Sequence, residues 1–299
     1  MGLGEFFSLS CALMWASAVI LYKYAGESMS ANTLNLTKNV IGLVLLVPTA
    51  LVLEGITLPS LSLTNWLIVI ASGYLGIAIA DTLYLETLRK IGASRTAIVA
   101  SLYSPFVVIF SIVYLGERLP AWQWLGFFMV LSGILVVVYR KTKSQVDSEQ
   151  LFKGVILGAS SVMLTAAGVV AMKPILSEAQ NNEHFFWLVT LRMLAGVVGM
   201  ILYLLLKNQV RSTYQVVFYQ THKWKTIFTA SCFGSYLALL FWLAGFKYTE
   251  ASVASVLNET SNVFIVIMAV LFLSEPIDRR KIAGVALTFI GVLVFLGFF

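Results

Sequence analysis

The sequence has few charged residues. Only 11% of its 299 residues are Asp, Glu, Lys or Arg, whereas 59% are hydrophobic, and the mean hydropathy is +0.90. A soluble domain carries about 25% charged residues because water must wet its surface. The charges present here cannot cover a globule of this size, so we expect most of the surface to face lipid. The 13% of aromatic residues also exclude a disordered chain.

Residues that build disulfides, metal sites and phosphate-binding loops are also scarce. Cys11 and Cys232 fall in different apolar runs and offer neither a disulfide framework nor a zinc set. His184 and His222 lie far apart near loops, and there is no His-Glu-x-x-His pair. No glycine-rich phosphate loop precedes a helix, so ATP-driven transport would need another subunit. The sequence therefore predicts no metal and no cofactor, and it disfavours an intramembrane enzyme.

Long apolar runs dominate the sequence instead. A bilayer core of about 30 Å requires about 20 apolar residues in a helix. Ten segments meet this requirement, namely 5–25, 32–53, 65–88, 95–115, 121–140, 153–176, 184–206, 224–246, 252–273 and 281–299. The runs are continuous and about twice as long as the alternating strands of membrane β-barrels. They predict an all-α polytopic membrane protein with ten transmembrane helices, the first a span rather than a removable signal peptide.

The basic residues predict the orientation in the membrane. Most of the 20 Lys and Arg residues lie in loops that follow odd-numbered spans, whereas the loops after even-numbered spans hold only Arg118, Lys173 and Lys247. Basic loops favour the cytoplasmic side. We therefore expect a multi-pass protein of the cell (inner or plasma) membrane, with both termini outside and the loop at 141–152 inside. The net charge of +6 is then a topology signal, and no nucleic-acid partner is expected.

The two halves of the chain are similar to one another. Shifting the sequence by 158 positions aligns Gly76 with Gly234, Glu117 with Glu275, Gly126 with Gly284 and Gly133 with Gly291, and small gaps align Lys38 with Arg192. Each half holds five expected helices, an odd number, so the second half must enter the membrane from the opposite side. The sequence thus predicts two inverted five-helix repeats, at 1–145 and 151–299. Inverted repeats are a common basis of alternating access around a midplane site.

Short motifs recur in both halves. Leu-Gly-Glu-Arg-Leu at 115–119 and its copy Leu-Ser-Glu-Pro-Ile at 273–277 each precede a glycine-rich helix. Together with the hydrophobic pattern and the basic residues at 38 and 192, they resemble the EamA family of the drug/metabolite transporter superfamily. The resemblance covers essentially the whole chain. It implies a ten-helix secondary carrier with a central cavity, often for export of amino acids or other small metabolites. Trp15-Ala16 stands where many members have Trp-Gly, a minor departure.

Four ionisable residues lie within expected spans: Lys38, Asp81, Arg192 and Glu259. Such a residue costs about 2.5–3.5 kcal/mol on insertion scales, so it should face the interior and have a partner. At a rise of about 1.5 Å per residue, the first two lie roughly 10 Å inside the cytoplasmic boundary, and the other two lie similarly deep from the outer one. We expect Lys38 to pair with Asp81 and Arg192 with Glu259, or each pair to line half of the pathway. Structural contacts between helices and snorkelling of the basic side chains are alternatives.

A polar stripe marks the ninth expected helix. Ser252, Ser255, Glu259 and Asn262 share one helical face, and their equivalents in the fourth helix are Ser94, Ala97, Ser101 and Ser104. Both stripes are expected to point inward. Small-residue packing is the favoured explanation for the stripe of the fourth helix, whereas Asn258 through Asn262 are too polar for packing alone. Pro105 is expected to kink the fourth helix.

Aromatic residues are the remaining candidates for ligand contact. Those well within spans are Trp15, Tyr74, Tyr84, Tyr103, Tyr236 and Trp242. An aromatic wall can hold a cationic substrate by cation–π attraction, although packing or interface anchoring is as compatible with the pattern. The predicted substrate-binding set is Trp15, Lys38, Asp81, Tyr84, Tyr103, Arg192, Tyr236, Trp242, Asn258, Glu259 and Asn262.

These features predict a secondary transporter that exports amino acids or similar small polar metabolites by alternating access. Asp81 or Glu259 would hold an ammonium group or a proton, and Lys38 or Arg192 a carboxylate, which together suit a zwitterion. One alternative is a carrier of organic cations or drugs. Another, of a different class, is a membrane sensor or scaffold that transports nothing. The expected partners are a small-molecule metabolite, the lipid bilayer and, for a coupled carrier, protons.

Overall fold

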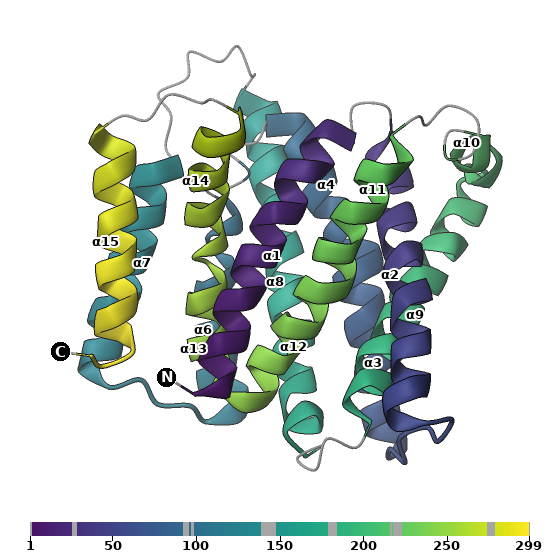
Figure 1. Ribbon diagram of the computed structural model, residues 1–299, viewed down its shortest axis with the longest axis horizontal. Helices are drawn as coiled ribbons and strands as arrows, with labels where there is room; N and C mark the ends of the chain where they lie inside the picture. Colours follow the sequence, from purple (N-terminus) through teal and green to yellow (C-terminus); the bar gives the residue numbers. More distant parts are fainter. Residues whose placement is uncertain are drawn as a thin grey trace.

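The computed structural model describes residues 2–25, 29–91, 96, 99–138, 148–178, 184–215, 217, 223–273 and 279–298, and it is all-helical over them. Figure 1 shows the helices standing side by side in one bundle, with both chain ends at its lower edge. The elements are α1 (Leu3–Ala25), α2 (Ala31–Glu54), α3 (Leu63–Gly73), η2 (Tyr74–Ala80), α4 (Asp81–Ile91), α6 (Tyr103–Phe110), η3 (Ser111–Leu115), α7 (Ala121–Val138), α8 (Ser148–Glu178), α9 (Phe185–Leu206), α10 (Val210–Gln215), α11 (Trp224–Ser231), η5 (Cys232–Ala238), α12 (Leu239–Tyr248), α13 (Ala251–Asn258), α14 (Ser261–Leu273) and α15 (Arg279–Phe295).

Helix length and composition indicate a membrane protein. Six helical stretches of the described chain are long and apolar enough to cross a bilayer: Leu3–Tyr22, Ala31–Glu54, Leu63–Thr87, Ser148–Glu178, Phe185–Leu206 and Trp224–Tyr248. Shorter apolar helices cover Tyr103–Leu115, Ala121–Val136 and Ile282–Phe295. The spans expected at 5–25, 32–53, 65–88, 153–176, 184–206 and 224–246 therefore correspond to six long helical stretches.

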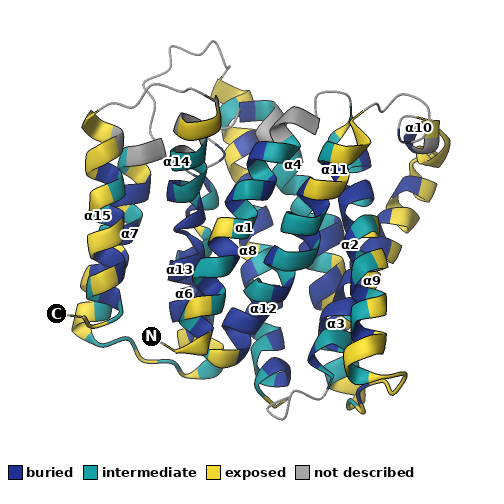
Figure 2. Ribbon diagram, in the orientation of Figure 1, coloured by how far each residue is buried: buried dark blue, intermediate teal, exposed yellow. Residues whose placement is uncertain are grey.

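Apolar side chains cover much of the outside of the bundle. Figure 2 shows exposed residues along the outer helices α9 and α15, and buried residues within the bundle. Val52 is 82% exposed, Val113 80% and Leu206 85%. Large apolar patches of this kind on a soluble monomer would be unusual and would promote association. Here they are suited to contact with lipid.

The prediction of a continuous helix is wrong for two of the expected spans. The span expected at 252–273 is interrupted by a turn at Glu259 and Thr260, which separates α13 from α14. In the span expected at 95–115, residues 99–100 are helical, Ser101 and Leu102 form a turn, and α6 begins at Tyr103. The two turns coincide under the shift of 158 positions. The apolar residues on either side of each turn kept both segments within one expected span, although the polar run from Asn258 to Asn262 coincides with the second turn.

Widened helical turns also coincide between the halves. The π-helical segments η2 and η5 each lie between two α-helices, and a shift of 158 positions carries one onto the other. Gly76 and Gly234 occupy the same place within them. π-Helical turns are rare and frequently mark functional sites. The carbonyl groups of Ile77 and Ala80 in η2 accept hydrogen bonds from polar side chains of the interior.

Two carboxylates cap distant helices. Glu117, from the recurring motif, accepts hydrogen bonds from the backbone N–H groups of Ala251 (2.7 Å) and Ser252 (3.0 Å) at the start of α13. Glu54 does the same for Phe186 and Trp187 at the start of α9 (both 2.9 Å). Each carboxylate satisfies two of the N–H groups that a helix N-terminus leaves without a helical partner. The motif copy at Glu275 lies outside the described residues.

Gly116 allows the Glu117 cap to form. Its φ of +71° lies in the left-handed region, which glycine adopts without steric cost, and it ends η3 directly before Glu117. The chain can therefore leave the helix and turn the carboxylate toward α13. The Leu-Gly-Glu motif thus combines a helix end with a cap for a helix that begins more than a hundred residues later.

Glycines bring α7 and α15 into close contact. A Cβ atom at Gly133 would lie 2.7 Å from the backbone nitrogen of Thr288 and 2.8 Å from the carbonyl oxygen of Gly284. At Gly126 it would lie 2.5 Å from the backbone nitrogen of Phe295. In lipid, such small residues let helix backbones approach and pack by van der Waals contact. The pair packs with Leu257 and Val263 in one apolar core, separate from the larger core around α8 and α9.

Candidate functional site

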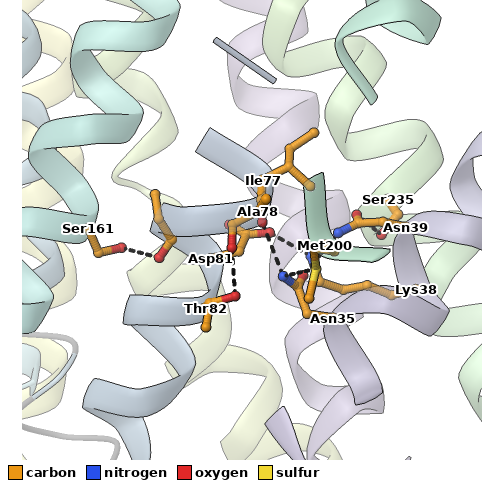
Figure 3. A network of polar contacts seen from close by, with 11 residues as sticks. Asn35, Lys38, Asn39, Ile77, Ala78, Asp81, Thr82, Ser161, Met200 and Ser235 are labelled. Carbon is orange, nitrogen blue, oxygen red and sulfur yellow. Dashed lines mark hydrogen bonds and ion pairs between the residues drawn. The ribbon is translucent and has the colours of Figure 1, made fainter. Parts of the chain in front are cut away.

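Lys38 and Asp81 form an ion pair in the interior. The Nζ atom of Lys38, on α2, lies 2.9 Å from Oδ2 of Asp81, the first residue of α4. Figure 3 shows the residues around this pair. The Lys38 side chain is 11% exposed and that of Asp81 35%, so the carboxylate is the more accessible partner. The pairing expected from the sequence is confirmed, and Lys38 does not snorkel away from its partner.

Amide and hydroxyl groups on the same helix as Lys38 and on the π-helical segments form a chain of hydrogen bonds beside this pair. Asn39 donates to the side-chain oxygen of Asn35 (2.9 Å), and Asn35 donates to the carbonyl of Ile77 in η2 (3.1 Å) and to the sulfur of Met200 (3.0 Å). Ser235 in η5 donates to Asn39 (3.4 Å). We call Asn35, Lys38, Asn39, Asp81 and Ser235 the Lys38 network. It connects α2 to both π-helical segments.

A second carbonyl of η2 has an external donor. Ser161 of α8 donates to the carbonyl oxygen of Ala80 at 2.7 Å, beside Asp81 (Figure 3). Buried carbonyl groups require donors. Side chains of α2 and α8 therefore hold η2 in place, and with it the position from which Asp81 projects.

The expected Arg192–Glu259 ion pair is wrong. Arg192 is 2% exposed, and its Nε donates to the hydroxyl of Ser72 at 3.0 Å. Its guanidinium carbon lies 4.9 Å from the ring centroid of Trp242, which is cation–π distance. Trp242 in turn donates from Nε1 to the Tyr103 hydroxyl at 3.1 Å. We call Ser72, Tyr103, Arg192 and Trp242 the Arg192 cluster. An aromatic face and a hydroxyl take the place of the carboxylate that the sequence suggested.

Space for Arg192 depends on the absence of a side chain at position 76. A Cβ atom there would lie 2.8 Å from a terminal guanidinium nitrogen. Gly76 belongs to η2, so the same π-helical segment supports the Lys38 network and accommodates the Arg192 cluster. Asp81 is also near enough to Arg192 to interact with it electrostatically. The two sites therefore adjoin one another.

Glu259 lies in the turn between α13 and α14. It is 5% exposed, and it accepts a hydrogen bond from Asn262 Nδ2 at 2.8 Å. Asn258 is 9% exposed, and neither polar atom of its side chain has a partner among the described residues. The polar stripe does face the fourth helix, since the hydroxyls of Ser255 and Ser104 lie 3.3 Å apart. Its equivalents Ser94 and Ala97 lie outside the described residues.

The other predicted aromatic residues occupy different surroundings. Tyr84 on α4 is half-buried and is within electrostatic reach of both Asp81 and Glu259. The Tyr236 hydroxyl lies 2.8 Å from that of Thr49. Trp15 is half-buried on α1. Tyr74 is 44% exposed, which indicates contact with lipid rather than with a ligand.

The predicted binding set did not include four polar residues of these two sites: Asn35, Asn39, Ser72 and Ser235. Asn35 and Asn39 lie three residues before and one after Lys38, so a search for amides near the interior lysine would have found them. Ser72 and Ser235 have no such signal, because single serines are common in membrane helices and gain meaning only from their contacts.

A polar cluster fixes the turn between α12 and α13. Lys173 donates to the Thr249 carbonyl at 2.7 Å, and the Thr249 hydroxyl donates to Glu5 of α1 at 3.1 Å. Glu250 precedes α13 in this turn. Partial burial and the nearby Glu117 raise the pKa of Glu250, against the opposing effect of Lys173. These contacts join α1, α8 and α13 at the end of the bundle where α13 begins.

Comparison with known proteins identifies the family. The sequence model of the EamA-like transporter family matches residues 2–139 and 152–297. The chain belongs to the EamA-like transporter family, within the drug/metabolite transporter superfamily. It is therefore a multi-pass membrane protein, and the resemblance seen in its motifs is confirmed.

Relatives of this EamA-like chain bear transporter names. The uncharacterized transporter YxxF of Bacillus subtilis is 26% identical over 150 residues, which are 50% of this chain and 47% of that protein. An uncharacterized transporter of Archaeoglobus fulgidus is 22% identical over 290 residues, 97% of this chain and 96% of the relative. Human solute carrier family 35 member F6 is 33% identical over 79 residues, 26% of this chain and 21% of that protein.

These matches differ in extent. The chain spans about half the length of YxxF and about a fifth of the solute carrier. One solved protein structure superposes with a TM-score of 0.79 at 16% identity, over 97% of this chain and 95% of the other, and this similarity shows the fold alone. The family and the names of the relatives point to a membrane transporter rather than an enzyme.

Proposed function

We propose that this chain is a secondary transporter that exports amino acids or similar small polar metabolites by alternating access. Its ten transmembrane helices would form two inverted five-helix repeats, at 1–145 and 151–299, in the cell membrane. The observation that carries the proposal is the set of adjoining interior charges: the Lys38–Asp81 ion pair, Arg192, which has no carboxylate partner among the described residues, and Glu259. Interior charges in a membrane protein usually mark a substrate or ion pathway.

A zwitterion fits these charges in a simple way. Its carboxylate would bind the guanidinium of Arg192, whose planar donors suit a carboxylate. Its ammonium group would bind the accessible oxygen of Asp81. Lys38 would then hold Asp81 in place when the carrier is empty, which would keep the carboxylate neutralised during the return step. Tyr84 and Tyr103, which lie close to these charges, would contact the rest of the substrate.

The irregular helical segments that recur in both halves of the chain support alternating access. The π-helical segments and the helix breaks both recur at a spacing of 158 residues. In transporters built from inverted repeats, discontinuous helices at the repeat interface form the binding site. In this proposal, the two breaks would be the points at which each half changes shape in turn.

Flux into proteoliposomes tests the proposal. Purified protein would be reconstituted and offered a panel of labelled amino acids, other small zwitterions and organic cations, with and without a pH gradient. We expect saturable uptake of at least one zwitterion, reduced at least tenfold by Arg192→Gln. Empty liposomes and the exposed Arg211→Gln variant are the controls. If no compound moves under either condition, the transport proposal fails in favour of a sensor or scaffold.

A carrier of organic cations is the second candidate. It is favoured by Glu259, which makes no ion pair with any described residue, and by the phenols of Tyr84 and Tyr103 in its electrostatic reach. The same panel distinguishes the two. A cation carrier would lose flux in Glu259→Gln but keep it in Arg192→Gln, whereas a zwitterion carrier depends on Arg192.

A further inference from the structure

The break between α13 and α14 places a carboxylate in the protein interior. Glu259 and Thr260 form the turn, and they are 5% and 1% exposed. The Glu259 carboxylate receives a hydrogen bond from Asn262, and the backbone N–H of Ser104 on α6 is close by. Both donors are neutral, so the described contacts leave the full negative charge of an ionised carboxylate unbalanced. Burying such a charge without a positive partner is strongly unfavourable.

The described basic side chains nearest to the interior all have other partners. Lys38 pairs with Asp81, and Arg192 contacts Ser72 and Trp242. At the far end of α12, Lys247 lies over the rings of Phe185 and Tyr248. Among the residues that the structure describes, none of these cations forms an ion pair with Glu259.

Among the described residues, the titratable groups around Glu259 place no positive charge within ion-pair distance of its carboxylate. Tyr84 on α4 and Tyr103 on α6 are within electrostatic reach, and Cys11 of α1 is near Tyr103. Glu5 of α1 contacts Thr249, before α13 begins. The α7 helix, which packs on α14, carries no titratable residue from Ala121 to Val138. Arg192 is also within electrostatic reach of Tyr103, but among the described residues it forms no ion pair with Glu259.

Asn258 adds an unsatisfied amide to this position. Both its oxygen and its nitrogen are buried without a partner among the described residues, one position before Glu259. Buried amides are normally hydrogen-bonded. The break also coincides with the break at Ser101 and Leu102 in the other half, and α13 packs against α6. The turn keeps tightened helical hydrogen bonds, such as Thr260 N–H to the Leu257 carbonyl at 3.1 Å. A carboxylate and a free amide oxygen at such an irregular point of a helix are ligand types that bind coupling ions in transporters.

We propose that the α13–α14 break binds one monovalent cation, a proton or a sodium ion, on the Glu259 carboxylate. A proton would convert the carboxylate into a neutral acid. A sodium ion would bind the carboxylate together with the Asn258 side-chain oxygen. Binding itself does not depend on the transport proposal, whereas the role of this cation as the coupling ion rests on it.

Infrared spectroscopy of purified protein tests whether Glu259 holds a proton. A proton held on Glu259 gives a C=O stretching band of a protonated carboxyl at neutral pH. We expect this band in the wild type and in Glu149→Gln, which changes an exposed carboxyl, and its absence in Glu259→Gln. Gln is isosteric with Glu, and its amide oxygen can accept the hydrogen bond from Asn262. We therefore expect this variant to fold.

Thermal unfolding tests whether a sodium ion binds at the break between α13 and α14. If sodium is the ligand, replacing choline chloride by sodium chloride raises the melting temperature of the wild type and of Glu149→Gln by about 2–4 °C. The rise is absent in Glu259→Gln and reduced in Asn258→Ala. Potassium chloride at the same concentration controls for ionic strength.

The wild type alone can overturn the proposal. If it shows neither a protonated carboxyl band at neutral pH nor a sodium-specific rise in melting temperature, the break binds no cation. Neither measurement needs a transported substrate. Flux without a bound cation would overturn only this inference, and a bound cation without flux of any compound would overturn only the proposed function.

Discussion

The interior charges of this protein are compensated in different ways. Lys38 has a carboxylate, Arg192 has an aromatic ring and a hydroxyl, and Glu259 has amide and backbone donors. The two basic residues align in the repeats, yet Asp81 falls on Leu239 and Glu259 on Ser101 under the shift of 158 positions. The halves therefore share an architecture while dividing the acidic groups between them.

The Lys38–Asp81 pair should respond to exchange of its charges. We expect Lys38→Asp and Asp81→Lys each to abolish flux, because each places two like charges together in the interior. The double exchange should recover part of the flux by restoring the pair. Removing one partner of a fully buried ion pair lowers the free energy of unfolding by about 3–5 kcal/mol. We expect a smaller loss here, because Asp81 is partly exposed. Flux in proteoliposomes is the measurement, and absence of any recovery would contradict a direct role of the pair.

Arg192 should not tolerate replacement by lysine. A lysine keeps the charge but loses the planar contact with Trp242 and the Nε–H that bonds Ser72. We expect Arg192→Lys to lower flux of a carboxylate substrate at least tenfold. Arg211→Lys, at an exposed position on α10, should leave flux unchanged. Equal flux in both variants would show that position 192 needs only a positive charge.

Sequence reasoning worked for residues whose chemistry conflicts with lipid. The four interior charges were found because lipid disfavours them, and one of the two expected pairs forms. The Arg192–Glu259 pair failed because opposite charge and similar depth do not fix the direction of a side chain around its helix. The break at Glu259 turns its carboxylate toward Asn262 and Ser104, and that geometry has no signal in hydropathy.

At the scale of helices, the Glu117 cap should stabilise α13. In Glu117→Gln one oxygen becomes an amide nitrogen, so one of the two hydrogen bonds to Ala251 and Ser252 is lost along with the charge at the helix N-terminus. We expect a loss of about 1–2 kcal/mol in stability, measured as a lower melting temperature. Glu149→Gln is the matched control at an exposed position. An unchanged melting temperature would mean that water replaces the cap.

The α7–α15 contact should not accept a larger residue at Gly133. A leucine there meets the backbone of Thr288 and Gly284, so the helices must separate. Overpacking costs about 1–3 kcal/mol when side chains can adjust, and more when backbone is in the way. We expect Gly133→Leu to lower the melting temperature markedly, whereas Ala283→Leu on the exposed face of α15 should not. Similar melting temperatures for the two variants would argue against the close contact.

Helix positions were predictable from the sequence, and helix irregularities were not. Runs of about 20 apolar residues locate spans because the bilayer fixes their length. A π-helical segment changes only the hydrogen-bonding period, and Tyr74–Ala80 is as apolar as its surroundings. The same is true of the turn at Ser101 and Leu102, where Pro105 indicated a kink but not its position.

At the scale of the whole molecule, the orientation in the membrane can be tested directly. Both chain ends lie at the same edge of the bundle (Figure 1), and the distribution of basic residues predicts that this edge faces outward. Reporters fused to the N-terminus and to the C-terminus should both report the outer side. A cytoplasmic N-terminus would contradict the predicted orientation, and reporters on opposite sides would contradict an even number of spans.

The π-helical segment η2 also bears on how this chain can vary in length. A single π-type turn holds one more residue than the α-helical turn that it replaces, so a chain one residue shorter between Gly73 and Asp81 could still form an unbroken, equally hydrophobic helix. Because the π-type turn absorbs the extra residue, the residues after the deletion would keep nearly the same direction in that helix. Asp81 would therefore still point toward Lys38. A relative with an identical set of charges but a one-residue gap here would be expected to keep the ion pair while losing the widened turn.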